Sequence, residues 1–289
     1  MQHFDMVLEP ARIANAAPAL PQPERRARED WQLVASWADS AEQIREAQQL
    51  RYRVFALEMG ARLTPPAGTA PGLDADRFDP FCDHLLVHAR QGGRRARTTL
   101  VGTYRVLSPA AARRAGGFYM DTEFDLAPLA TLRRDAVELG RSCVAPGWRS
   151  GAVIMVLWSA LGAYMRAHNA QTMIGSASIA LPEDLQGVVR LWHGIKDSHL
   201  ASLALRVRPY TGLPGNLSDA SDHVSAPAEA QSTVASDLAL PPLIKGYLRC
   251  GACVLGPPAL DLAFNTADLP MMLKVDDLAP RYRRHFLEH

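Results

Sequence analysis

The segment Ala136-Val-Glu-Leu-Gly-Arg-Ser-Cys-Val144 is the most informative part of this 289-residue sequence for its architecture. Its composition predicts a strand. The strand runs through Pro146-Gly-Trp-Arg149 into a helix that begins near Gly151, where apolar residues recur at three- and four-residue steps. A strand that leads directly into a helix is a building unit of mixed α/β folds.

Further elements are expected on both sides of this unit. Helices are predicted over 40–59, 109–115 and 183–193, strands over 84–89, 99–107 and 172–178, and late apolar structure over 243–255 and 264–272. This order predicts a mixed α/β sheet in one domain spanning 31–287. The composition of residues 1–30 predicts a poorly ordered leader, and that of 214–237 a mobile loop.

The overall charge and the cysteines exclude several classes of function. The formal charge is +1, from 31 basic and 30 acidic residues, so no global field attracts nucleic acid or a membrane. The four cysteines suit reduced thiols in a cytoplasmic protein, and Cys250-Gly-Ala-Cys253 has no second pair to complete a metal site. The longest uncharged run, 150–165, is shorter than the roughly 20 residues that span a bilayer.

Two charged residues of the central strand are candidates for chemistry. In regular alternation Glu138 and Arg141 would point to opposite faces. Gly140 is a natural place for a bulge, and one extra residue would bring both side chains to the same side and free backbone N–H and C=O groups. A surface ion pair on an edge strand is the simpler interpretation of these residues alone.

A group of aspartates precedes His84. Asp74, Asp76, Asp79 and Asp83 lie within ten residues and allow three interpretations. They can cap a solvated turn, bind a metal, although the spacing is not that of a calcium loop, or line a pocket for a cationic amine. His84 alone is as readily a structural histidine as a base.

Taken together, these features resemble the autoinducer (N-acyl-homoserine lactone) synthases, a branch of the GNAT acyltransferase fold. That family has an Arg…Phe helix motif, two aspartates, a Gly-Thr-x-Arg strand, an aromatic-containing loop and Glu-x-x-Arg on the central strand. The matching positions are Arg51, Phe55, Asp76, Asp79, Arg105, Phe124, Glu138 and Arg141. The tryptophan that the family places after the helix is absent at Gly60-Ala-Arg62, and the match ends near residue 180.

A resemblance to the L-ornithine Nα-acyltransferases covers nearly the whole chain after residue 30. It rests on Asp79-Pro-Phe-Cys-Asp-His-Leu-Leu-Val87, on Glu138-Leu-Gly-Arg141, and on the late runs 242–252 and 256–261, which autoinducer synthases lack. The resemblance implies a GNAT fold, with a mixed, mostly antiparallel sheet, a splayed central strand and flanking helices.

The same resemblance implies a reaction and its partners. A 3-hydroxyacyl chain would pass from acyl carrier protein to the α-amine of L-ornithine, giving lyso-ornithine lipid in the first step of ornithine-lipid synthesis. The donor would be carried on phosphopantetheine, with no tightly bound cofactor and no metal. We expect a cytoplasmic enzyme whose lipid product brings it into peripheral contact with the inner membrane, and no nucleic-acid partner.

Roles for the site residues follow from the resemblance. Glu138 is the expected general base, worth roughly 10²–10⁴-fold in rate. Arg141 is grouped with Glu138 as catalytic. Either Arg141 or Arg105 is expected to bind the ornithine carboxylate through a bidentate fork. Backbone N–H groups freed by the bulge would stabilise the oxyanion.

The remaining side chains are assigned to substrate binding. Asp76 and Asp79 are expected either to face the δ-ammonium of ornithine or to hold Arg51 in place. Further substrate contacts are expected from Phe55, His84 and Phe124.

The start of the helix after the central strand departs from the usual GNAT pattern. Acetyltransferases of this fold carry Arg/Gln-x-x-Gly-x-Gly/Ala there, whereas this chain has Trp148-Arg-Ser-Gly-Ala-Val153. The departure favours a carrier-protein donor, which has one phosphodiester, over free coenzyme A. Arg149 and the helix N-terminus at Gly151 are the candidates for meeting that phosphate.

Docking of an acidic carrier protein requires a basic face, and the acyl chain requires an apolar slot. Helix residues Val153, Val156 and Leu157 are expected to line the slot. The candidate docking groups are Arg94/Arg95/Arg97, Arg113/Arg114, Arg133/Arg134 and Arg281/Arg283/Arg284.

Three rival functions remain open at this point. The first is an N-acyltransferase of the same fold for glycine, glutamine or lysine. The second is an autoinducer synthase. The third is a module that binds a carrier protein or a membrane surface without catalysis.

Overall fold

The computed structural model describes residues 31–92, 96–181, 185–214 and 240–287. The leader predicted at 1–30 and all but the first residue of the loop predicted at 214–237 lie outside these residues. Among the described residues, no helix is long and apolar enough to cross a bilayer.

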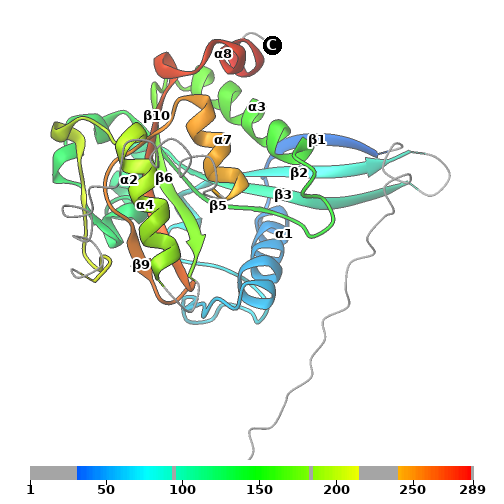
Figure 1. The fold of residues 1–289 in the computed structure, drawn as a ribbon. Coiled ribbons are helices and arrows are strands. Elements are labelled where there is room, and N and C mark those ends of the chain that lie inside the picture. The colour runs from blue at the N-terminus through cyan, green and yellow to red at the C-terminus, as the bar shows by residue number, and fades with distance from the viewer. Residues whose placement is uncertain (1–30, 93–95, 182–184, 215–239, 288–289) are drawn as a thin grey trace, which may run out of the picture.

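An eight-stranded mixed sheet forms the centre of the molecule (Figure 1). Its order is β1 (Trp31–Trp37), β2 (Asp83–Gln91), β3 (Arg97–Leu107), β5 (Ala136–Val144), β6 (Thr172–Ala180), β10 (Thr266–Lys274) and β8 (Cys253–Val254), with β9 (Ala259–Asp261) also paired to β10. All pairs are antiparallel except β5–β6. Two short strands, β4 (Phe124–Asp125) and β7 (Arg208–Pro209), pair separately.

Helices cover both faces of this sheet (Figure 1). They are α1 (Ala41–Tyr52), continued by a π-helical turn over Arg53–Glu58, α2 (Pro109–Ala115), α3 (Ala152–Ala167), α4 (Gln186–His199), α7 (Pro242–Cys250) and α8 (Pro280–Leu287). Helix α3 packs on β1, β2 and β3, while α1 contacts β2, β3 and β5 from the opposite side. The sheet between them therefore has two buried faces.

Local signals in the sequence fix the ends of the shorter helices. The Ser40 hydroxyl accepts from Gln43 N at the start of α1. Ser108 caps α2 in the same way, and Gly116 ends it with a φ of 81°, a left-handed conformation that favours glycine. The predicted helices and strands are confirmed in outline, although α4 runs further than the predicted 183–193 and β1 was not predicted.

The central strand β5 leaves its neighbour β6 after three residue pairs. The parallel pairing runs only from Ala136–Thr172 to Glu138–Ile174. The backbones are still close just beyond, since a side chain at Gly175 would collide with the carbonyl oxygen of Leu139. The later part of β5 lines a cavity instead of pairing with β6. The expected splay of the central strand is confirmed.

A bulge lies on the other edge of β5, against β3. Thr103 pairs with Cys143 and Arg105 with Gly140, so β5 contains one extra residue between these pairs. Arg141 has a φ of 50°, a left-handed conformation that costs an ordinary residue about 1–2 kcal/mol. The predicted bulge is confirmed, but Arg141 rather than Gly140 adopts the unusual conformation.

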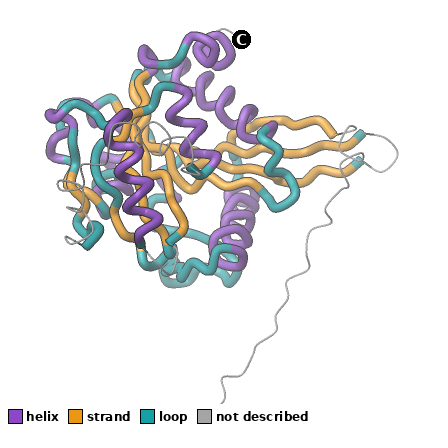
Figure 2. The backbone as a smooth tube through the Cα atoms, in the orientation of Figure 1, coloured by secondary structure: helices purple, strands orange, loops and turns teal. Residues whose placement is uncertain are grey.

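The loop after α1 closes one end of the sheet against the β9–β10 hairpin (Figure 2). Arg62 N donates to the carbonyl oxygen of Ala263 at 2.7 Å. Phe55 packs edge-on against Phe264, with ring centroids 5.8 Å apart. Segments about 200 residues apart are thereby joined at the rim of the cavity described next.

Candidate active site

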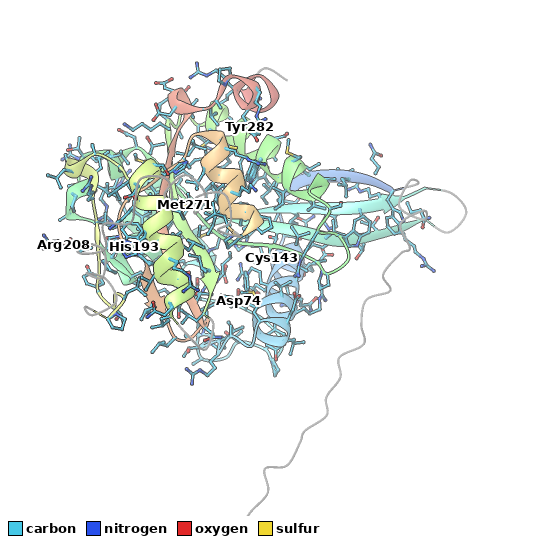
Figure 3. The ribbon with its side chains drawn as sticks, in the orientation of Figure 1. Asp74, Cys143, His193, Arg208, Met271 and Tyr282 are labelled. Carbon is cyan, nitrogen blue, oxygen red and sulfur yellow. The ribbon has the colours of Figure 1, made fainter. Side chains whose placement is uncertain are left out.

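A cavity of about 1000 Å³ opens where β5 and β6 diverge. Strand β5 contributes residues 138–144, α3 contributes its first turn, and α7 lines another side. Cys143 and Tyr282, both labelled in Figure 3, also line it. The bulge and the splay therefore turn the second half of the central strand into one wall of a large open site.

Glu138 is a buried carboxylate in the wall of this cavity, 4 % exposed. Its two oxygens accept hydrogen bonds from Tyr119 N and Met120 N, each at 2.7 Å, at the start of the 3₁₀ turn Tyr119–Thr122. Burial raises the pKa of Glu138 to about 7, against the two backbone hydrogen bonds, which lower it. The carboxylate can therefore take up or release a proton near neutral pH.

Arg141 lies on the same side as Glu138, as a bulge allows. Its guanidinium stacks over the rings of Tyr119, at 4.8 Å, and Phe264, at 4.4 Å. It is 3.4 Å from a carboxylate oxygen of both Asp74 and Asp76, and its Nε has no hydrogen-bond partner within the described part of the chain. The Arg141 side chain also hydrogen-bonds Tyr119, so a ligand carboxylate at the cavity would compete with Tyr119 and with the two long ion pairs.

The aspartates that precede β2 are already matched by arginines. Arg51 is 1 % exposed; its Nε donates to Asp74 at 2.9 Å and its Nη2 to Asp79 at 2.7 Å. Arg105 Nη1 donates to Asp76 at 2.7 Å. Although burial alone would raise it, the Arg51 guanidinium holds the pKa of Asp79 well below its usual range. We call these three aspartates, Asp74, Asp76 and Asp79, the paired cluster.

The first turn of α3 reaches the cavity with the residues predicted for a phosphate. Gly151 caps the helix with a φ of 89°, and both Gly151 and Arg149 line the cavity. The Arg149 guanidinium forms a fork with Glu58, at 2.5 and 2.8 Å, and its Nε donates to Val144 O. An anion at this helix N-terminus would compete with Glu58 for Arg149.

Comparison with known proteins assigns the family. A model of the acetyltransferase (GNAT) domain matches residues 50–159. L-ornithine N(alpha)-acyltransferase of Brucella abortus (strain 2308) is 36% identical over 258 residues, covering 88% of this chain and 88% of that protein. The chain belongs to the L-ornithine Nα-acyltransferase family.

Other L-ornithine N(alpha)-acyltransferases are similar to this chain to the same extent. The Agrobacterium fabrum protein of that name is 38% identical, covering 88% of this chain and 85% of its own, and the Rhodobacter capsulatus protein is 34% identical, covering 86% and 92%. Among solved structures, the AHL synthase LasI has 12% identity and a TM-score of 0.47, covering 88% of this chain and 94% of its own. Because that score is below 0.5, the GNAT fold assigned here rests on the strand arrangement and the matched domain.

Not every residue predicted from the resemblance reaches the cavity. Phe55 and Arg105 line it, as Glu138 and Arg141 do. Phe124 instead is fully buried in the hydrophobic core. His84 is 2 % exposed, with Nε2 3.1 Å from Asp79 O, and burial lowers its pKa.

The paired cluster and Arg51 also lie behind the cavity wall. Asp79 holds Arg51, which was one of the two predicted alternatives. Asp76 pairs with Arg105 and lies 3.4 Å from Arg141. These carboxylates are occupied by arginines of the chain itself, so their geometry fits a scaffold for the arginines.

A second set of acidic residues was missed by sequence reasoning. Glu123 is distant in the sequence from Asp261 and Asp268, which both lie on the β9–β10 hairpin, and the carboxylate oxygens of all three lie within 4.8 Å of one another. Asp261 ends the run Gly256-Pro-Pro-Ala-Leu-Asp261, which pointed to the family but to no role. We call these three carboxylates the open cluster.

Proposed function

We propose that this member of the L-ornithine Nα-acyltransferase family transfers a 3-hydroxyacyl chain from acyl carrier protein to the α-amine of L-ornithine, giving lyso-ornithine lipid. The observation that carries the proposal is the 36% identity to an L-ornithine N(alpha)-acyltransferase along 88% of both chains. The buried carboxylate in the cavity wall supplies a group suited to the reaction.

Glu138 begins the reaction as general base. It takes one proton from the α-ammonium, and the free amine attacks the thioester carbonyl carbon so that a C–N bond forms. The tetrahedral intermediate then collapses, the C–S bond breaks, and the nitrogen's second proton passes to the departing pantetheine thiolate. A base with a pKa of about 7 is well placed, because it is deprotonated yet still basic near neutral pH.

Two parts of β5 support this step. Beyond Glu138 the strand is no longer paired to β6, and backbone N–H groups facing the cavity are candidates for stabilising the oxyanion. Arg141 is our candidate for the α-carboxylate of the amino acid, because its guanidinium lines the cavity and its own ion pairs are long.

The acyl donor would occupy the other side of the cavity. Arg149 and the N-terminus of α3 would meet the pantetheine phosphate. A second, apolar cavity of about 90 Å³ shares Trp158 and Leu139 with the main one and suits the acyl chain. Val153 and Leu157, predicted to line the acyl slot, are instead buried in the core against Gly102.

The arginine groups differ in how they relate to the cavity. Arg281 and Arg283 flank Tyr282, which lines it, so we favour this group for docking the acidic carrier protein. Arg94 and Arg95, and the side chain of Arg284, lie outside the described residues. Salt-sensitive carrier-protein binding that survives charge reversal at 281 and 283 would rule this group out.

An amino-acid panel tests the proposed substrate. The protein is incubated with 3-hydroxyacyl carrier protein and one amino acid at a time: ornithine, lysine, glutamine or glycine. We expect ornithine to give the highest kcat/KM and an α-amide product by mass spectrometry. Preferred acylation of glycine or glutamine would contradict the proposal.

A further inference from the structure

The open cluster gathers three carboxylates from two distant parts of the chain, the segment at Glu123 and the β9–β10 hairpin. Glu123 follows the 3₁₀ turn whose first N–H groups bind Glu138, while Asp261 ends β9 and Asp268 lies on β10. Asp261 and Asp268 line the main cavity, and Glu123 accepts from Ser176, also in the cavity wall, at 2.7 Å. The cluster therefore adjoins the site that contains Glu138.

No basic side chain of the described residues neutralises these carboxylates. In the described ranges no lysine, arginine or histidine forms an ion pair with Glu123, Asp261 or Asp268. Burial, and then the neighbouring carboxylates, raise the pKa of Glu123, and burial raises that of Asp268. Gathering acids in this way is unfavourable for the empty protein and favours the arrival of a cation.

Buried polar atoms at the cluster also lack partners. Asp268 is 4 % exposed, and side-chain hydrogen bonds link its carboxyl group to Ser178, Thr266 and Glu123, but its Oδ1 has no partner among the described residues. The same is true of Glu123 Oε1. Because buried polar atoms are nearly always satisfied, these atoms indicate a ligand that donates several hydrogen bonds.

We propose that the open cluster binds the δ-ammonium of ornithine and so selects a dibasic amino acid. An ammonium group carries one positive charge and three donors, which three converging carboxylates can accept. Arg141 stacks on Tyr119, whose backbone N–H donates to Glu138. Its guanidinium would bind the α-carboxylate at the other end of the ornithine molecule. The inference rests on the function proposed above and adds to it the residues that recognise the side chain.

The assignment accounts for selectivity among amino acids. Glycine and glutamine bring no cation, so binding either would leave the open cluster desolvated and uncompensated. A divalent metal is the other cation that three carboxylates accept. Such an ion prefers six or more oxygen ligands. The described residues offer three carboxylates with the Thr266 hydroxyl nearby, so a metal would need further ligands from solvent, whereas an ammonium group would not.

Kinetics with a substrate that lacks only the δ-amine isolate this contact. The unmodified protein and its Asp268→Asn and Glu123→Gln variants are assayed with L-ornithine and with L-norvaline, which is ornithine without the δ-amine. Each variant should raise the KM for ornithine about 10- to 100-fold, the effect of losing a charged hydrogen bond. Neither should change kcat/KM for norvaline more than a few-fold, so the preference for ornithine collapses.

The matched control is Asp197→Asn, since Asp197 is exposed on α4 and does not line the cavity. It should leave both substrates unchanged. Circular dichroism melting confirms that each variant is folded, and Asp261→Asn replaces either one that is not.

Each outcome decides a different point. An unmodified protein that does not acylate ornithine contradicts the proposed function and this inference together. One that prefers ornithine to norvaline, with variants that keep that preference, contradicts the inference alone. Activity lost to EDTA and restored by Mg²⁺ or Ca²⁺ would assign the cluster to a metal and overturn the inference.

Discussion

Two groups of three acidic residues differ in whether basic side chains pair with them. The paired cluster comes from one short segment, and each of its carboxylates contacts Arg51, Arg105 or Arg141. The open cluster comes from two segments, the one at Glu123 and the β9–β10 hairpin, and no basic side chain of the described residues pairs with it. The difference indicates that the first group positions the arginines of the site, whereas the second is incomplete until a cation binds.

The largest expected effect concerns Glu138, which belongs to neither cluster. Glu138→Gln removes the base, so turnover should fall roughly 10²–10⁴-fold. In the unmodified protein kcat/KM should rise as pH passes about 7, because Glu138 must be deprotonated to act, and the variant should lack that inflection. The measurement is a pH profile of thiol release.

Asp121→Asn is the control for this variant. Asp121 accepts from Phe118 N at 2.7 Å and so caps the same 3₁₀ turn that Glu138 binds. Its loss should disturb the turn but keep turnover within a few-fold. If both variants lose activity equally, the role of Glu138 is to hold the turn and the base assignment fails.

Breaking the paired cluster should cost the most stability. Arg51→Met leaves Asp74 and Asp79 buried without their main counter-charge, which should lower the free energy of unfolding by about 3–5 kcal/mol. Urea denaturation measures it. Arg133→Met, which removes a half-buried pair with Asp121, should cost about 1 kcal/mol or less. Equal losses in the two variants would contradict the structural role of the paired cluster.

The two clusters should also respond oppositely to pH. The pKa of Asp79 is lowered by Arg51, so its contribution to stability is present above about pH 4 and is lost as pH falls. The pKa of Asp268 is raised by burial, so its contribution is present below about pH 4 and is lost as pH rises.

Single substitutions of Asp79 and Asp268 should therefore change the free energy of unfolding in opposite directions as pH rises. Urea denaturation at several pH values measures both trends. Asp79→Asn should lose most stability, relative to the unmodified protein, at neutral pH. Asp268→Asn should gain stability relative to the unmodified protein as pH rises, because burial raises the pKa of Asp268. A neutral-pH loss in both variants would mean that the open cluster is compensated after all.

The smallest effect is expected at an exposed pair. The Arg149 and Glu58 side chains are 47% and 38% exposed, so Arg149→Met should change stability by about 1 kcal/mol at most. It should raise the KM for the acyl carrier protein donor a few-fold and leave that for ornithine unchanged. A change in the KM for ornithine alone would contradict this, because it would place Arg149 at the amino acid and not at the donor phosphate.

Much of the site was predictable where its residues are close together in the sequence. The bulge near Gly140 and the shared side of Glu138 and Arg141 follow from strand periodicity, because a single extra residue reverses the alternation. The choice of Arg141 as the left-handed residue did not follow, since it depends on stacking against Tyr119 and Phe264 from other segments.

The open cluster shows what the sequence alone could not provide. Glu123 and Asp268 are 145 positions apart, and isolated acidic residues in a sequence carry no sign of a shared site. Phe124 shows the reverse error: an aromatic residue at a motif position was expected at the substrate, yet it fills the core. Both outcomes depend on packing between distant segments.

The proposed acyl transfer can be followed as thiol release from 3-hydroxyacyl carrier protein, measured with and without L-ornithine. We predict that release depends on ornithine, yields one thiol per ornithine consumed, and gives a product acylated on the α-nitrogen by mass spectrometry. Release that is independent of ornithine, or no release while the carrier protein still binds, would contradict acyl transfer to ornithine.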